Sequence, residues 1–321
     1  MQNSHTISSD IRAIQIRSAI DEIRNDRASG AAKQTVRAAR LLVECARHTP
    51  ADLAEIVRAL TDAQPTTGPI YNLAAIALHS HDVSAVCRDF LESMERNAAF
   101  VAERAAAMVS DGDTVMTHSF SSTILTALRE VSWGGKRVSV ICPESRPICE
   151  GIAMAASLGM SGIPVSLIAD AAIHHVLPDV QLVLVGADAA SPLGIFNKTG
   201  TALLALAARE LGVRVYALCS SDKFLPRSYN PPKETLKDPR ELLERELPHV
   251  TVANYHFDVT PLDYFTGIVT EEGILTPAEL RKRFVSKHAA SEPVLATPVG
   301  PQDTARAALQ SQQRSEQVVS C

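Results

Sequence analysis

Apolar positions in the first hundred residues recur at steps of three and four, which is the period of an α-helix. The longest such stripe runs from Val83 to Met108 and spans about seven turns at 3.6 residues per turn. Asp111-Gly112-Asp113 follows it, and a strand pattern begins directly afterwards. We therefore expect residues 1–110 to form a helical domain, joined to the next domain without a flexible linker.

From Thr114 onward the pattern changes to short apolar runs of strand length, separated by helical segments rich in Ala and Leu. Five such runs occupy residues 114–117, 137–142, 164–168, 181–186 and 213–218. Strands that alternate with crossover helices are typical of a parallel sheet. The sequence thus predicts an α/β protein, with an N-terminal helical domain followed by a parallel-sheet domain at residues 111–285.

The last part of the chain has a different composition. Residues 286–321 consist mainly of Ala, Gln, Ser, Pro and Thr, with few large apolar side chains. Such a segment cannot bury enough apolar surface to offset the entropy lost on ordering, so we expect a disordered tail. The segment 226–248 is charged and begins with several prolines. We expect it to run over the surface.

The 321 residues carry a formal net charge of −5 with both signs interspersed, which argues against nucleic acid or an anionic membrane as main partner. No apolar run approaches the roughly 20 residues that span a bilayer, and the first ten residues do not have the pattern of a signal peptide. The six cysteines have no paired ligand spacing, which indicates reduced thiols in a cytoplasmic protein. His174-His175 has no further ligand at metal-site spacing, so we expect no metal, and we expect no cofactor.

Four short polar segments stand at or just beyond the predicted strands. They are THSFSS at 117–122, ESRP at 144–147, VGAD at 185–188 and NKTGT at 197–201. In open parallel sheets, ligands bind beyond the carboxyl ends of the strands, and we expect all four segments at that edge. The sequence therefore predicts a binding site there.

In this order, the four segments resemble one protein family. It holds the alpha, beta and delta subunits of translation initiation factor 2B, and two isomerases that act on ribose 1,5-bisphosphate and 5-methylthioribose 1-phosphate. Further matches are DRASGA at 26–31, QPTTGPIYN at 64–72, FDVTP at 257–261 and TEEG at 270–273. The resemblance covers most of the chain before the tail. It implies that the second domain is Rossmann-like and that the protein assembles into homodimers or homohexamers.

Asp188 ends the almost wholly apolar run QLVLVGAD. A carboxylate at the lip of a buried sheet is desolvated, which raises its pKa toward the range that suits a proton shuttle. The alternative is a carboxylate that caps the next segment. The isomerases use the Asp at this position as a catalytic acid or base, so the resemblance implies the same role for Asp188.

Ser119 is a second catalytic candidate, and here the sequence departs from the isomerases. They carry a Cys at this position, whose thiol exchanges a proton with the sugar carbon. A serine hydroxyl ionises far less readily than a thiol, whose pKa is about 8.5, so Ser119 without assistance is a poor replacement. His118 could assist, or Cys142 or Cys149 could supply a thiol. The simpler alternative is that His118 is a structural hydrogen-bonding histidine and that both cysteines pack in the core, which we favour for the cysteines.

Asn197 and Lys198 precede the helical run 202–210. A helix N-terminus presents free N–H groups and a positive dipole, and Lys198 adds a full charge, so a phosphate would be held well here. The alternative is an ordinary helix start capped by Asn197 or Thr199. In the isomerases this Asn-Lys pair contacts substrate, which the resemblance extends to this chain.

The remaining candidates for substrate binding each have a simpler structural alternative. Ser121 and Ser122 offer donors to a second phosphate, or they cap a helix. Arg146 binds an anion in a bidentate manner if it points inward, or it pairs with Glu144. Lys223 matches a substrate-binding Lys of the family, or it is a solvated charge at the end of a strand.

The resemblance adds two further expectations in the helical domain. The loop Arg27, Ala28, Ser29 and Gly30 is expected to fold over the sugar phosphate. Gln64 stands where the bisphosphate isomerase has an Arg, so one phosphate contact is weaker here or absent.

Together these features predict an aldose–ketose isomerase that converts an aldose 1-phosphate, or a close relative, to the 2-ketose phosphate. The second hypothesis is a non-catalytic protein that senses a phosphorylated sugar or a nucleotide and resembles the initiation-factor subunits, in which this site binds or senses rather than catalyses. Asp188 favours the enzyme. Ser119 and Gln64 favour the sensor or a changed substrate.

Overall fold

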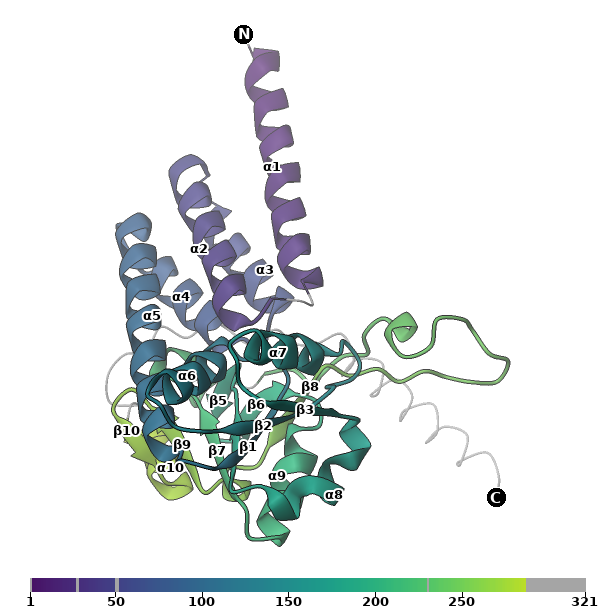
Figure 1. Cartoon of the computed structure of the whole chain (residues 1–321). Helices are drawn as coiled ribbons and strands as arrows, with labels where there is room; N and C mark the ends of the chain where they lie inside the picture. The colour runs from purple at the N-terminus through teal and green to yellow at the C-terminus, as the bar shows by residue number, and fades with distance from the viewer. Residues whose placement is uncertain (1, 27–28, 50–51, 230, 287–321) are drawn as a thin grey trace, which may run out of the picture.

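The computed structural model describes residues 2–26, 29–49, 52–229 and 231–286 of the chain, and Figure 1 shows a helix-rich first part above a mostly parallel sheet. The helices of the first part are α1 Gln2–Asn25, α2 Ala31–His48, α3 Leu53–Ala63, α4 Gly68–Leu78 and α5 Val83–Met108. Leu42, Leu60 and Ile70 are completely shielded from solvent in the core that α2, α3 and α4 share. The predicted helical character of this region is confirmed.

Helix α5 has the bounds that the apolar stripe predicts, and it joins the two parts of the molecule. Asp82 caps its N-terminus by accepting a hydrogen bond from the backbone N–H of Ala85 at 2.9 Å. Val83 belongs to the core of the helical part, whereas Val101 and Ala105 belong to the core on one face of the sheet. Because one continuous helix enters both cores, it fixes the helical part over the sheet.

The main sheet has the strand order β10-β9-β7-β4-β1-β2-β3, in which only the β9–β10 pair is antiparallel. The strands are β1 Thr114–His118, β2 Ser139–Pro143, β3 Val165–Ile168, β4 Leu182–Val185, β7 Arg214–Leu218, β9 Gly267–Thr270 and β10 Gly273–Leu275. The five predicted apolar runs form β1, β2, β3, β4 and β7, and the α/β fold is confirmed. The central strands are apolar on both faces because helices cover both.

The helices of this second part are α6 Ser122–Trp133, α7 Glu150–Gly159, α8 Ile173–Val176, α9 Thr201–Glu210 and α10 Pro277–Ser286. The chain runs outward from β1 through β2 to β3, and then returns to the other side of β1 with β4. The strand order therefore reverses between β1 and β4, where His118 lies beside Val185. Open parallel sheets bind ligands at such a reversal, beyond the carboxyl ends of the two strands.

A second, antiparallel sheet was not predicted. It consists of β5 Ala189–Ser191, β6 Gly194–Lys198 and β8 Phe257–Thr260, in the order β5-β6-β8. Asn197 and Lys198 therefore end a strand, and α9 begins only at Thr201. The expectation that Asn197 and Lys198 precede a helix is confirmed, but the strand that they end was not predicted. β5 is too short to show a period, and β6 finds its partner β8 far along the chain.

The segment between β7 and β8 leaves the body of the molecule as a long loop, which Figure 1 shows in green. It contains the short helix Pro239–Glu241 and matches the predicted excursion over the surface. Ser286 ends α10, and the remaining residues of the predicted tail lie outside the described part of the chain. Among the described helices, none is long and apolar enough to cross a membrane.

Candidate active site

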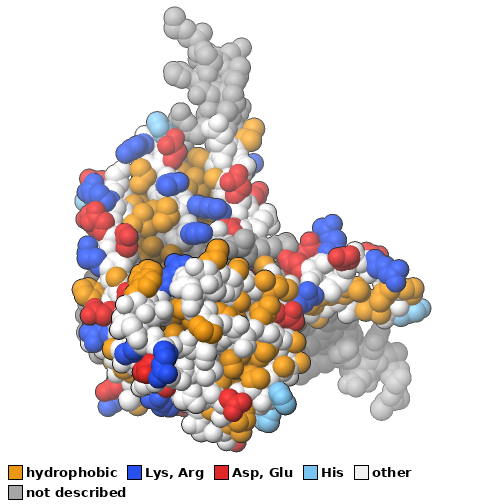
Figure 2. Space-filling model, in the orientation of Figure 1, with side chains coloured by type: hydrophobic (Ala, Val, Ile, Leu, Met, Phe, Trp, Pro, Cys, Tyr) orange, Lys and Arg blue, Asp and Glu red, His pale blue; other side chains and the backbone are white. Residues whose placement is uncertain are grey.

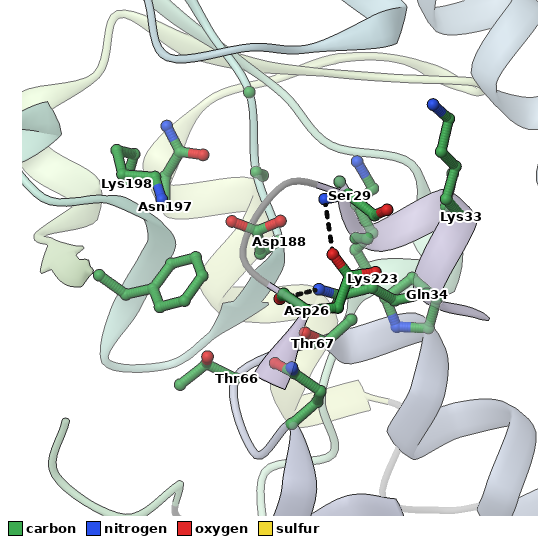
Figure 3. Close-up of a pocket in the computed structure, with 18 of the residues that line it drawn as sticks. Asp26, Ser29, Lys33, Gln34, Thr66, Thr67, Asp188, Asn197, Lys198 and Lys223 are labelled. Atoms are coloured by element: carbon green, nitrogen blue, oxygen red, sulfur yellow. Dashed lines mark hydrogen bonds between the residues drawn. The ribbon is translucent and has the colours of Figure 1, made fainter. Parts of the chain in front are cut away.

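A cavity of about 940 Å³ lies between the helical part and the carboxyl ends of the central strands. Figure 3 shows part of its lining. The polar side of this lining consists of the segments that follow β1, β4 and β7, the end of β6, and the starts of α2 and α7. Its members include Ser29, Gly30, Gln64, His118, Ser119, Ser121, Ser122, Glu150, Asp188, Asn197, Lys198 and Lys223. Segments distant in sequence thus meet at one place.

Asp188 reaches the cavity three residues beyond Val185, the last residue of β4, and its backbone is fixed on both sides. Its N–H donates to the carbonyl of Phe196 at 2.8 Å, and its carbonyl accepts from the N–H of Gly68 at 2.9 Å. Gly68 permits this contact because a Cβ atom there would lie 2.4 Å from the carbonyl oxygen of Lys223. The start of α4 therefore holds the Asp188 and Lys223 segments in place.

The Asp188 carboxyl has no hydrogen-bond partner among the described residues. Burial raises its pKa to about 6, while the charges of Lys223 and Lys198 act in the opposite direction and that of Glu150 raises it further. In Figure 3, Asp188 lies between the pair Asn197 and Lys198 and the side chain of Lys223. The carboxyl is thus free to exchange a proton close to neutral pH.

Lys198, in contrast, is already paired. Its Nζ lies 2.9 Å from Oε2 of Glu150 and 5.0 Å from the centroid of the Phe257 ring. The Lys198 side chain is 6% exposed and that of Glu150 is 18% exposed, so water screens the pair only weakly. An incoming anion would compete with Glu150 for this ammonium group.

Sequence reasoning missed Glu150, the first residue of α7. Its Oε2 also accepts a hydrogen bond from the Ser119 hydroxyl at 2.9 Å. The only signal in the sequence was a carboxylate three residues beyond the ESRP motif. The partner of the Ser119 hydroxyl is therefore a carboxylate, and not His118 as the sequence allowed.

Ser119 has a backbone φ of 64°, in the left-handed region, where a residue with a Cβ is strained. Its N–H donates to the hydroxyl oxygen of Ser145 at 2.8 Å, which holds this conformation. His118 is buried, and its Nε2 donates to the carbonyl of Thr199 at 2.8 Å. Burial is the main cause that lowers the pKa of His118 and favours its neutral form. His118 therefore has the structural hydrogen-bonding role that the sequence left as the alternative.

No cysteine supplies a thiol to the described lining of the cavity. Cys142 is buried in β2, and burial raises the pKa of its thiol to about 12. Cys149 is half-buried, and its Sγ lies 3.9 Å from Nη1 of Arg146. The proposed rescue of Ser119 by a neighbouring thiol finds no support in this geometry.

The N-terminus of α9 is already occupied by the protein itself. Oδ2 of Asp258 accepts from the N–H of Gly200 at 2.8 Å and from that of Ala202 at 3.2 Å. Neither Asn197 nor Thr199 caps the helix, and the Asn197 amide instead donates to Oγ1 of Thr201 at 3.0 Å. Two of the amides expected here as a phosphate site, those of Gly200 and Ala202, therefore already have an acceptor.

Lys223 has no such competitor in the described part of the chain, and the first turn of α6 is only partly capped. Lys223, at the end of the short helix Ser221–Lys223, forms no ion pair with any described residue. Ser121 caps α6 by accepting from the N–H of Ile124 at 3.4 Å, and Ser122 begins that helix. A helix leaves its first-turn N–H groups without a partner inside the helix, so this end of α6 suits an anion.

The remaining predicted residues are divided between the cavity and other places. Gln64 is buried in the cavity wall and donates to the carbonyl of Ile23 at 2.7 Å, while Ser29 and Gly30 line the cavity. Arg146 is exposed and lies outside the described lining of the cavity. It donates a hydrogen bond to the carbonyl of Glu241 at 3.1 Å, so it neither points into the cavity nor pairs with Glu144. The predicted residues Arg27 and Ala28 lie outside the described residues.

Comparisons with known proteins agree with this architecture. The sequence model described as "Initiation factor 2 subunit family" matches residues 6–277. A Pyrococcus horikoshii protein named "Putative translation initiation factor eIF-2B subunit 2-like" is 36% identical over 230 residues, which is 70% of this chain and 80% of the relative. The ribose 1,5-bisphosphate isomerase of Archaeoglobus fulgidus is 31% identical over 282 residues, 82% of this chain and 90% of the relative. The crystal structure of Pyrococcus horikoshii translation initiation factor eIF-2B matches with a TM-score of 0.74 at 31% identity, covering 82% of this chain and 97% of that one.

Proposed function

The chain belongs to the initiation factor 2 subunit family, and we propose that it is a sugar-phosphate isomerase that converts an aldose 1-phosphate to the 2-ketose phosphate. The observation that carries this proposal is the Asp188 carboxyl, which faces the cavity without a hydrogen-bond partner among the described residues. Its pKa of about 6 lets it both give and take a proton near neutral pH. A structural carboxylate in a buried place would instead be paired or hydrogen-bonded.

The substrate class follows from the charges around Asp188. Lys223 and the first turn of α6 offer an ammonium group and backbone donors to a phosphate, and Asn197 and Lys198 offer a second polar anchor. The reaction itself moves one hydrogen from C2 to C1 after the sugar ring has opened. The helical part forms one wall of the cavity, and a substrate bound against it would expose less of the unsaturated intermediate to water. Relatives named for ribose 1,5-bisphosphate support a pentose phosphate.

A second candidate function rests on a specific observation. Ser119 carries a hydroxyl where the isomerases that the chain resembles have a thiol, and the described cavity lining contains no cysteine. Relatives named as initiation-factor subunits support a protein that binds a phosphorylated sugar or a nucleotide without turning it over. In that case Asp188 would recognise a sugar hydroxyl and not exchange protons with carbon.

We further propose that the protein works in the cytoplasm as a homodimer or homohexamer. Trp133 is 75% exposed and Met160 82% exposed, at the ends of α6 and α7. Figure 2 shows apolar side chains gathered on this side of the sheet part. Apolar surface of this kind is commonly covered in an assembly.

Deuterium exchange followed by NMR tests the isomerase. In D₂O the native protein is expected to place deuterium in ribose 1-phosphate, ribose 1,5-bisphosphate or 5-methylthioribose 1-phosphate. Asp188→Asn should slow this exchange by about 10²–10⁴-fold, because the amide cannot transfer the proton. Asp62→Asn changes an exposed carboxylate of the cavity wall on α3 and is the matched control, which should keep the native rate.

Exchange by native protein and Asp188→Asn at equal rates, or by neither, would contradict the isomerase for these sugars. Titration calorimetry with the same three compounds then separates the two functions. Tight binding without exchange would favour the sensor.

A further inference from the structure

Asp188 and Glu150 both line this cavity, from different elements, and their surroundings differ. Asp188 follows β4 and has no hydrogen-bond partner among the described residues. Glu150 begins α7 and accepts two charged or polar donors at one oxygen, the Lys198 ammonium and the Ser119 hydroxyl, each at 2.9 Å. The charge of Glu150 is one of the causes that raise the pKa of Asp188, so the two groups are close enough to influence each other.

Unequal surroundings are how a protein gives two carboxyl groups opposite tasks. Oε2 of Glu150 accepts two donors, whereas the Asp188 carboxyl has none among the described residues, and burial raises the pKa of Asp188. Both groups lie at the same sheet edge, one beyond each side of the reversal between β1 and β4. A sugar lying over that edge would have Glu150 on one side and Asp188 on the other.

We propose that Glu150 is the base that takes the proton from C2 of the sugar, and that Ser119 positions it for this task. This proposal rests on the isomerase function above. Ser119 then stands at the position of the thiol of the related isomerases, but it does not take over the proton transfer of that thiol. Its strained backbone, with φ 64°, aims the hydroxyl at Glu150 from the end of β1.

The proton transfers balance without a further reactant. Asp188 gives its proton to the ring oxygen as the bond between that oxygen and C1 breaks. Glu150 takes the C2 proton, and the electron pair of the C–H bond forms the C1–C2 double bond of an enol phosphate. Glu150 then returns its proton to C1, while Asp188 takes the proton of the C2 hydroxyl as the C2 carbonyl forms. The product is the open-chain 2-ketose 1-phosphate, and both carboxyl groups end as they began.

If Glu150 had only a structural role, replacing it with Gln would have little effect on turnover. As a simple counter-ion it would only keep Lys198 in place, and an amide with the same shape would serve nearly as well. Glu150→Gln keeps an oxygen acceptor for Ser119 and Lys198 but cannot take a proton from carbon. The substitution therefore distinguishes a residue that only holds Lys198 and Ser119 in place from one that acts as the base.

The test compares native protein, Glu150→Gln and the matched control Glu144→Gln in steady-state assays with each of the three sugar phosphates named above. Glu144 stands near Glu150 in the chain but outside the described lining of the cavity. We expect Glu150→Gln to lower kcat by about 10²–10⁴-fold while KM changes by less than about 3-fold, and Glu144→Gln to keep both. Ser119→Ala should lower kcat by about 10-fold with little change in KM, because the base is still present but less well oriented.

The outcomes distinguish this proposal from the function on which it rests. An active native protein whose Glu150→Gln variant keeps more than half of the native kcat overturns the role of Glu150 alone. A loss of kcat in Glu150→Gln that is matched by an equal loss of sugar-phosphate affinity, measured by calorimetry, also overturns it, since the substitution would then have disturbed the binding site and not removed a base. A native protein that turns over none of the three sugars contradicts the isomerase itself, and the base assignment with it.

Discussion

The two sides of the cavity floor differ in whether their polar side chains already have partners in the protein. On the paired side, Ser119, Glu150 and Lys198 form one connected network with distances of 2.9 Å. On the open side, the side chains of Asp188 and Lys223 face the cavity without a hydrogen bond or ion pair to any described residue. Unsatisfied buried groups lower the free energy of unfolding, so proteins retain them mainly where a ligand or a reaction needs them.

The difference assigns separate tasks to the two sides. The paired side is organised before any ligand arrives, because each of its groups already has its partner. On the open side, the Lys223 ammonium group remains available to bind a phosphate, and the Asp188 carboxyl remains available to bind a proton. Substitutions on the paired side should therefore change the stability of the protein as well as turnover, whereas substitutions on the open side should change ligand binding and turnover with little effect on stability.

The largest expected difference in stability is between the two lysines. Lys198→Met leaves the Glu150 carboxylate without its counter-charge in a place that is 18% exposed, and should lower the free energy of unfolding by about 3 kcal/mol. Lys223→Met breaks no ion pair and should change it by less than about 1 kcal/mol. Chemical denaturation at neutral pH measures both values.

A double variant sharpens this comparison. Glu150→Gln added to Lys198→Met removes the unpaired charge and should recover most of the lost stability. Equal losses for Lys198→Met and Lys223→Met, or no recovery in the double variant, would show that the two sides do not differ as described.

A smaller effect is expected at the start of α9. Asp258→Ala removes the acceptor of two backbone N–H groups and should lower the free energy of unfolding by about 1 kcal/mol. Asp263→Ala is the control, because that carboxylate is exposed and pairs with Arg281 on the surface. If both variants lose the same amount of stability, Asp258 does not contribute as the cap of α9.

Much of the fold could be predicted from the sequence because its patterns are local. The stripe of α5 is long enough to show its helical period, and β1 and β4 are continuous apolar runs of strand length, as strands buried on both faces are. The division into domains at 1–110 and 111–285 stays a prediction, since α5 contributes to the cores on both sides of that boundary.

The candidate site was less predictable because its contacts join distant segments. Glu150 meets Ser119 across 31 residues, and Asp258 meets Gly200 across 58. Neither carboxylate has a sequence pattern that reveals its partner. The position of Asp188 was predictable, because the apolar run before it requires a buried strand that ends at the ligand edge.

The most direct test of this account is a titration of the Asp188 carboxyl itself, by ¹³C NMR of the labelled protein, with Asp188→Asn to assign the signal. We expect a midpoint at about pH 6, because burial raises the pKa of this group from 3.8. In Lys223→Met the midpoint should move higher, since the Lys223 charge lowers the pKa of Asp188. A midpoint near 3.8 in the native protein would contradict the account, because an ordinary solvated carboxylate would carry almost no proton at neutral pH.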